Sequence, residues 1–405
     1  MEKNKIHKIL SLTETCSGCF ACANICPKDA ITLPANFEGF YFPVIDQEKC
    51  IDCGLCDKVC PQLTEMTGNR MQRAYYGWSN DDAVRKSSSS GGIFNALAIA
   101  TLKEGGVVYG AAFNYEGMVR LECRSTEEVA LNELMRSKYV QNYIGFAFRK
   151  IKTDLKNGKK VLYCATPCQV AGLKSYLGKM DCSQLITVDF ICHGVPSMDL
   201  LQKHLEYLGI KYIEDINFRP KNRGWVDDFE ITYKKNPASP DVKCRRIPWR
   251  HDEYYNIFQK YCNIRRSCRN CPYSQGVRLS DITIADFWGV KKYKPELWDA
   301  RGISLVIANN ERGALIVDSL VGRQCTIKEL PLKYAEYVYE RDRQSPDSLY
   351  QSKKRDAFLH DVYTIGYGKA LERHGFKTTK GSLLKYRFHG WISKIKKNVI
   401  SRNNK

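Results

Sequence analysis

The sequence of 405 residues lacks the long apolar runs and the export signal of membrane and secreted proteins. No stretch approaches the ~18 consecutive apolar residues of a membrane-spanning helix, and residues 1–12 contain too few apolar residues for a signal peptide. The sequence also lacks a Gly-x-Gly-x-x-Gly run between a predicted strand and a predicted helix, so it gives no support for direct use of NAD(P)H. We therefore expect a cytoplasmic protein of about two or three domains.

Cysteine, by contrast, is abundant, because the chain has 18. Cytosolic thiols are kept reduced, so this number argues against disulfides and for bound metal. Two runs near the start share the spacing C-x2-C-x2-C-x3-C-P, which places three cysteines around one iron-sulfur cluster and sends the fourth to the other cluster. Structural zinc sites would leave the third cysteine and the proline of each run unexplained. We expect two [4Fe-4S] clusters, the first on Cys16, Cys19, Cys22 and Cys60 and the second on Cys50, Cys53, Cys56 and Cys26.

The repeat resembles a bacterial two-cluster ferredoxin module and covers residues 11–66. Beyond a polar boundary near residue 70, predicted strands alternate with predicted helices, and after residue 212 the strands lengthen and become more mixed or antiparallel. The predicted helices span 93–103, 169–177 and 198–208, and the predicted strands span 106–112, 160–165, 185–191, 281–289 and 303–309. We expect an α+β or α/β protein with a two-cluster ferredoxin domain over 1–70, an α/β region over 71–210, a mixed β region over 211–345 and a helical basic tail over 346–405.

The net charge of +19 is unevenly distributed, since residues 377–405 contain nine Lys or Arg and no Asp or Glu. Thiolate-bound clusters would add negative charge, so we expect no nucleic-acid partner and disfavour a colourless zinc protein that binds nucleic acid. From about residue 382, apolar residues recur at helical spacing between basic ones. This C-terminal amphipathic helix would either dock on the protein or lie on the inner face of a membrane.

Two segments of the body are candidate binding loops. The run Ser88, Ser89, Ser90, Gly91 and Gly92 enters the helix predicted over 93–103, which suits either a bound phosphate or simple helix capping. Thr166 and Cys168 lie where a predicted strand meets a predicted helix, the usual place for ligands in open α/β sheets. Cys168 there is either a reactive thiol or a metal ligand.

Four cysteines of the body form a further candidate metal set: Cys168, Cys192, Cys268 and Cys271. Two of them end predicted strands and two form a C-x2-C pair, and Cys262 is the substitute if one of the four is wrong. The isolated cysteines Cys123, Cys164, Cys182, Cys244, Cys262 and Cys325 are otherwise expected to be small buried apolar residues.

Several motifs together resemble the coenzyme F420 hydrogenase/dehydrogenase beta-subunit family over about residues 75–345. They are Ser-Ser-Ser-Gly-Gly-Ile-Phe from 88, Ser-Lys-Tyr-Val-Gln from 137, Thr-Pro-Cys-Gln from 166, Cys-His-Gly-Val-Pro-Ser from 192, Asn-Phe-Arg-Pro-Lys from 217, Cys-Arg-Asn-Cys-Pro-Tyr from 268 and Asp-Ile-Thr-Ile-Ala-Asp-Phe-Trp-Gly from 281. The resemblance implies FAD beside a third [4Fe-4S] cluster, with Cys168, Cys192, Cys268 and Cys271 as its ligands. It makes the loop 88–92, Lys138, Tyr139 and Thr166 candidates for cofactor contacts. Ala285 stands where the family motif has glycine.

A flavin converts single electrons into a two-electron hydride, so the cofactors that the resemblance implies are chemically consistent. His193 is a candidate proton donor, although such a residue often only binds backbone. We expect an oxidoreductase that moves electrons between a reduced carrier, ferredoxin or coenzyme F420, and a small organic substrate, with bacterial polysaccharide synthesis as one setting. The alternative is an electron-transfer subunit of a hydrogenase or dehydrogenase with no substrate of its own.

Overall fold

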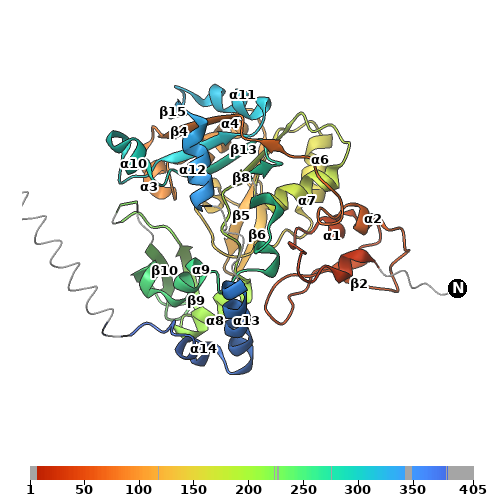
Figure 1. Ribbon diagram of the computed structural model, residues 1–405, viewed down its shortest axis with the longest axis vertical. Coiled ribbons are helices and arrows are strands. Elements are labelled where there is room, and N and C mark those ends of the chain that lie inside the picture. Colours follow the sequence, from red (N-terminus) through yellow and green to blue (C-terminus); the bar gives the residue numbers. More distant parts are fainter. Residues whose placement is uncertain are drawn as a thin grey trace, which may run out of the picture.

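The computed structural model describes residues 7–379 and 381, apart from 117, 223, 226, 227, 275 and 343–348. Its parts are a central sheet with flanking helices, an N-terminal lobe beside α6 and α7, and a smaller sheet with helices near α13 and α14 (Figure 1). None of the helices in the described ranges is long and apolar enough to cross a membrane.

An eight-stranded mixed sheet forms the centre, in the order β15-β4-β14-β13-β8-β7-β5-β6. Four neighbouring strands, β5, β7, β8 and β13, are parallel, and all the other pairings in this sheet are antiparallel. The strand bounds are Arg73–Ser79 (β4), Val107–Asn114 (β5), Arg120–Ser125 (β6), Val161–Cys164 (β7), Leu185–Phe190 (β8), Ile282–Asp286 (β13), Ser304–Ala308 (β14) and Cys325–Leu330 (β15).

Helices cover both faces of the parallel strands. Side chains alternate between the two faces of a strand, so Leu162 of β7 packs with α4 (Ile93–Lys103) and α11 (Glu311–Leu320). Its neighbours Val161 and Tyr163 pack with α6 (Ala147–Lys156) and α7 (Pro167–Leu177) on the other face. The parallel strands are therefore apolar on both sides, which explains why they read as continuous hydrophobic runs.

The N-terminal lobe contains both cysteine runs and repeats its backbone conformation. Gly18 and Asp52 occupy equivalent positions with φ of +63° and +54°, and Phe20 and Gly54 do so with +68° and +69°. The lobe elements are η1 (Lys8–Ser11), α1 (Ala21–Ile25), β1 (Ile31–Thr32), β2 (Val44–Ile45) and α2 (Leu55–Lys58). Its buried residues belong to the same apolar core as those of α6 and α7, so the lobe is packed onto the body (Figure 1).

A second layer lies around an antiparallel sheet of β9 (Tyr212–Asn217), β10 (Asp228–Lys234) and β11 (Lys243–Pro248). Its core includes Phe218, Phe229 and Tyr254. The helices beside it are α8 (Met198–Tyr207), α9 (Glu253–Gln259), α13 (Leu349–Thr364) and α14 (Tyr367–Arg373). The remaining elements are β3 (Asn69–Arg70), β12 (Val277–Arg278), α3 (Asp82–Ser87), α5 (Leu131–Leu134), α10 (Val290–Tyr293), α12 (Leu332–Asp342), η2 (Trp249–His251), η3 (Arg266–Cys268), η4 (Pro272–Ser274) and η5 (Pro295–Leu297).

The mixed α/β architecture predicted from the sequence is confirmed, and the predicted helix over 93–103 coincides with α4. The other predicted elements of the body lie within two residues of observed ones at each end, apart from the strand over 281–289, which ends three residues early at Asp286. The central sheet takes strands from both sides of residue 210, because β4 lies between β14 and β15. The amphipathic helix predicted from residue 382 falls outside the described residues.

Candidate functional site

The first cysteine group brings together Cys16, Cys19, Cys22 and Cys60, as the crossed spacing predicts. All four line one small cavity, together with apolar side chains of the lobe. Burial raises the pKa of the Cys19 thiol to about 12, and the negative charges of Cys60 and Cys16 add to the rise. Cysteines bind metal as thiolates, so a cationic cluster would offset both effects. The residues therefore fit a [4Fe-4S] cluster.

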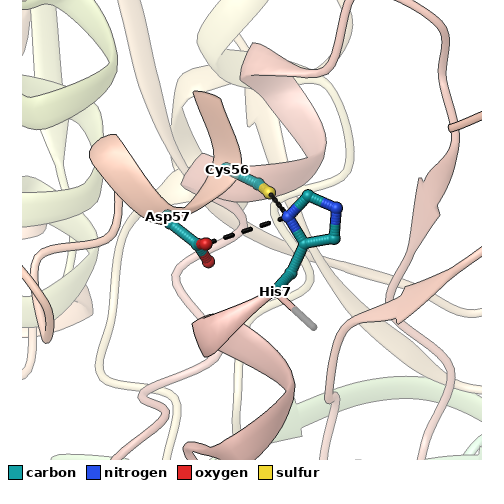
Figure 2. Close-up of side chains that lie close together, drawn as sticks. All are labelled: His7, Cys56 and Asp57. Atoms are coloured by element: carbon teal, nitrogen blue, oxygen red, sulfur yellow. Dashed lines mark hydrogen bonds and ion pairs between the residues drawn. The ribbon is translucent and has the colours of Figure 1, made fainter. Parts of the chain in front are cut away.

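The second cysteine group has an unexpected histidine beside it. His7 is buried, with Nε2 3.5 Å from Cys50 Sγ and Nδ1 3.4 Å from Cys56 Sγ. Figure 2 shows its ring beside Cys56 and Asp57, whose Oδ2 lies 3.8 Å from Nδ1. Cys53, by contrast, is exposed. This group is thus the one that reaches the protein surface.

The third group is the predicted set of Cys168, Cys192, Cys268 and Cys271. Cys168 is the second residue of α7, Cys192 lies two residues after β8, and the C-x2-C pair lies in and after η3. Burial raises the pKa of Cys271 to about 12, and the charges of Cys168 and Cys268 contribute. The pKa of Cys192 rises for the same reasons, with contributions from the other three members. Four half-buried cysteines whose thiolates would repel one another fit a cationic metal centre better than an apolar core.

The substitute ligand Cys262 lies elsewhere, fully buried in the core around β10 and α9. Thr166, predicted as a cofactor contact, belongs with the third group, because its Oγ1 lies 3.2 Å from Cys168 Sγ. Of the other isolated cysteines, Cys325 is buried, Cys244 is exposed and Cys164 lines the large cavity described below.

Helix α7 joins the first and third groups. It carries Cys168 at its first turn, and one turn later Gly172 contacts Cys19 so closely that a Cβ there would lie 2.8 Å from the Cys19 Cβ. Burial raises the pKa of Tyr273, and the charges of Cys168, Cys19 and Cys271 raise it further, so this phenol lies beside both groups. Residues in direct contact with one another therefore lie between the first and third cysteine groups.

A cavity of about 500 Å³ lies where β7, β8 and β13 end, the edge at which open α/β sheets bind ligands. It is lined by residues from α4, the segment 134–139, the ends of the parallel strands and α9. Ile191 and His193, which flank the third-group ligand Cys192, both line it. The cavity thus begins next to the third cysteine group.

The serine and glycine loop, which was predicted to contact a phosphate or a cofactor, lies at this cavity. Ser88, Ser89, Ser90 and Gly92 line it, at the N-terminus of α4. Gly91 does not, because it packs against the backbone, where a Cβ would lie 2.4 Å from the carbonyl oxygen of Gly77. The loop is held by internal bonds, since Ser89 Oγ accepts from the Ser137 N–H (2.7 Å) and Ser90 Oγ donates to the Ile303 carbonyl (2.9 Å). The loop therefore borders the cavity in a fixed conformation.

Two lysines with lowered pKa values lie at this end of the cavity, one in its wall and one behind the serine loop. Burial, aided by Arg136, lowers the pKa of Lys138 to about 7, and its Nζ donates to the Met135 carbonyl at 2.6 Å. Lys138 and its neighbour Tyr139, both predicted as cofactor contacts, line the cavity. Burial also lowers the pKa of Lys221 to about 7, and its Nζ donates to the Ser90 carbonyl. Lys221 thereby fixes the serine loop from behind.

The cavity wall also contains an ion pair that was not predicted from the sequence. Arg219 Nη1 lies 2.8 Å from Asp286 Oδ2, and the Trp225 indole donates to the other carboxylate oxygen at 2.9 Å. Trp288 lies beneath the guanidinium, 5.2 Å from its central carbon, and stacks on Trp225. Arg219 and Asp286 both belong to motifs that resemble the family, and the ion pair could have been predicted from that resemblance. Nothing in the sequence pointed to His7.

His193 lies between the third cysteine group and this ion pair. Burial lowers its pKa, and Asp286 partly opposes that effect while Arg219 adds to it. The candidate proton donor therefore faces the cavity, at its end nearest to Cys192.

Comparisons with known proteins match two parts of the chain, the N-terminal lobe and the body that contains the third cysteine group. A family model for the carboxyl-terminal part of the coenzyme F420 hydrogenase/dehydrogenase beta subunit matches residues 158–331, and one described as "4Fe-4S dicluster domain" matches residues 15–63. Residues 158–331, a little under half of the chain, resemble the coenzyme F420 hydrogenase/dehydrogenase beta-subunit family. The resemblance seen in the motifs is thus confirmed. The dicluster match spans all eight cysteines of the two runs, and the beta-subunit match spans the third group and His193.

Individual proteins match this chain in part. It is 20% identical over 263 residues to an F420H2 dehydrogenase subunit of Methanosarcina mazei, which is 60% of this chain and 73% of that protein. It is 38% identical over 52 residues to Ferredoxin-1 of Caulobacter vibrioides, 12% of this chain and 42% of the ferredoxin. A chain of the F420-reducing [NiFe] hydrogenase complex from Methanosarcina barkeri aligns with 18% identity and a TM-score of 0.43, over 75% of this chain and 92% of that chain.

Proposed function

We propose that this chain is an electron-transfer subunit that connects ferredoxin-type clusters with a flavin, in an assembly of the hydrogenase or dehydrogenase type. The observation that carries the proposal is the succession of sites. The surface-reaching second group and the first group share one lobe, Gly172 and Tyr273 connect the first group to the third, and His193 connects the third group to the cavity. Adjacent redox centres in this order would form a path for single electrons.

The third cysteine group would hold a third [4Fe-4S] cluster, and the large cavity would hold FAD. The serine loop at the N-terminus of α4 and Lys138 provide backbone N–H groups and a cation for its phosphates, and Tyr139 provides an aromatic wall. When bound, a flavin exchanges single electrons with a cluster and a hydride with a second molecule. Thr166 would hold Cys168 in place, and His193 would exchange the proton that accompanies the hydride.

The electron carrier would dock near Cys53, the exposed ligand of the second group. The two-electron partner would be a deazaflavin such as coenzyme F420, because the family model and the Methanosarcina mazei relative both carry that name. The other expectation is an enzyme that reduces an organic substrate of its own. It depended on the family resemblance, and its setting in polysaccharide synthesis depended also on the basic tail. The amphipathic helix predicted from residue 382 lies outside the described residues, and the Methanosarcina mazei relative is named as a dehydrogenase subunit.

The test begins with iron, sulfide and flavin measured on one anaerobically purified sample. We expect about twelve iron and one flavin per chain, of which Cys192→Ser loses about four iron and the matched control Cys262→Ser loses none. The reduced protein should then bleach coenzyme F420 and leave NAD⁺ unchanged. About eight iron with no flavin would contradict the third cluster and the hydride chemistry together. Full cofactor content without reaction with F420 would contradict only the choice of partner.

A further inference from the structure

Arg265 is a fully buried cation between the first and third cysteine groups. The residue is 1% exposed, and its side chain makes three hydrogen bonds to neutral oxygens. Nε donates to the carbonyl of Cys16 (2.6 Å), Nη2 to the carbonyl of Tyr41 (2.9 Å), and Nη1 to the amide oxygen of Gln141 (3.4 Å). The guanidinium also lies over the ring of Phe42, 4.2 Å from its centre. This arginine therefore holds the loop that carries a first-group ligand.

The neighbouring arginines differ from Arg265 in one respect. Arg266 pairs with Glu14, Glu38 and Asp356, and Arg355 pairs with Glu38 and Asp356. Within the described part of the chain, no carboxylate forms an ion pair with Arg265. A buried charge without a counter-ion is strongly unfavourable, so this position implies a negative partner that is not a side-chain carboxylate.

The third cysteine group is a source of such charge within reach of Arg265. The backbone of Arg265 belongs to the loops of this group, because its N–H donates to the Val195 carbonyl and its carbonyl accepts from the Cys268 N–H. The positive charge of Arg265 also lowers the pKa of Cys168 and of Cys268, against the stronger effect of burial, so the guanidinium lies within electrostatic reach of both thiols. Four thiolates around a cluster would supply a net negative charge.

We propose that Arg265 is the internal counter-cation of the third cluster and raises its reduction potential. This inference rests on the proposed function for the existence of that cluster. A fixed positive charge in a buried site favours the more negative, reduced form of a neighbouring cluster. Electrons from the ferredoxin lobe would then be drawn inward, toward the cavity, instead of remaining on the outer clusters. Arg265 acts here as a positioning and tuning residue and contacts no substrate.

The test is a redox titration of the anaerobically purified holoprotein followed by electron paramagnetic resonance. Arg265→Met removes the charge at similar volume, Arg265→Lys keeps it, and Arg266→Met is the matched control because its charge is already paired. In Arg265→Met we expect the ratio of reduced to oxidised third cluster at a fixed potential to fall about tenfold, which is ~59 mV for one electron. The other two variants should stay within about threefold of the wild type.

A third-cluster ratio in Arg265→Met that matches the wild type would overturn the proposal. If Arg265→Met loses about four iron together with the paramagnetic signal of the third cluster, the lysine variant decides; loss of the first-cluster signal instead overturns the proposal. Retention of the cluster in Arg265→Lys supports a requirement for charge, whereas loss in both variants means that the guanidinium shape is needed and overturns it. A wild type with only about eight iron would instead remove the proposed third cluster, and this inference with it, before any variant is compared.

Discussion

Substitution of Gly172 by alanine should lower the stability of the protein, although alanine has the higher helix propensity. In an exposed helix interior, alanine is favoured over glycine by ~1 kcal/mol. At Gly172, however, the new Cβ would lie 2.8 Å from the Cβ and 3.0 Å from the Sγ of Cys19. Overpacking of this kind costs about 1–3 kcal/mol. Because Cys19 is held by its cluster loop, we expect a net loss of about 1 kcal/mol and partial loss of the first cluster.

The assay is anaerobic urea unfolding followed by circular dichroism, with iron measured on the same samples. Gly368→Ala in α14 is the matched control, because its Cβ would make only ordinary contacts of 3.4 and 3.5 Å with the ring of Tyr207. We expect a lower urea midpoint for Gly172→Ala and an unchanged or higher one for Gly368→Ala. A Gly172→Ala protein as stable and as iron-rich as the wild type would refute the close packing of α7 on the cluster loop.

Three further predictions concern individual charges and ligands. Burial alone would raise the pKa of Asp252, but His204 and Arg245 lower it from 3.8 to about 2. The stabilising contribution of the Asp252 carboxylate is therefore lost as the pH falls through that range. The variant Asp252→Asn should make stability less dependent on pH in acid unfolding measured by circular dichroism. Lys138 loses its charge above pH about 7, so flavin affinity in fluorescence titrations should fall by at most about tenfold per pH unit there, and Lys138→Met should abolish that slope. Cys60→Ser should remove the paramagnetic signal that Cys22→Ser removes, whereas Cys26→Ser should remove the other ferredoxin signal.

The local features of this protein could be predicted from the sequence. Spacing alone assigned Cys60 to the first run, and the structure places it with Cys16, Cys19 and Cys22. Hydrophobic periodicity located α4 to the residue, since its buried face is set by neighbours a few positions away. Such features depend on short-range geometry, which a single sequence contains.

Long-range features could not be predicted in the same way. The insertion of β4 between β14 and β15 joins segments more than two hundred residues apart, and no local pattern encodes that pairing. Lone residues such as Arg265 and His7 gain their significance only from what the fold packs against them. Thr166 shows the opposite case, because its place at a strand end was predicted correctly while its partner proved to be the Cys168 thiol.

The apolar core that the lobe shares with helices α6 and α7 has a consequence for the rate of internal electron transfer. Arg149 of α6 strengthens it with bonds to the carbonyls of Ala23, Asn24 and Cys26. In redox proteins with tethered carrier domains, electron transfer depends on movement of the carrier domain. The rate of that movement falls as the solvent becomes more viscous. Here the clusters and the cavity would be fixed in one rigid unit, so the internal electron-transfer rate should be the same in buffer and in concentrated glycerol.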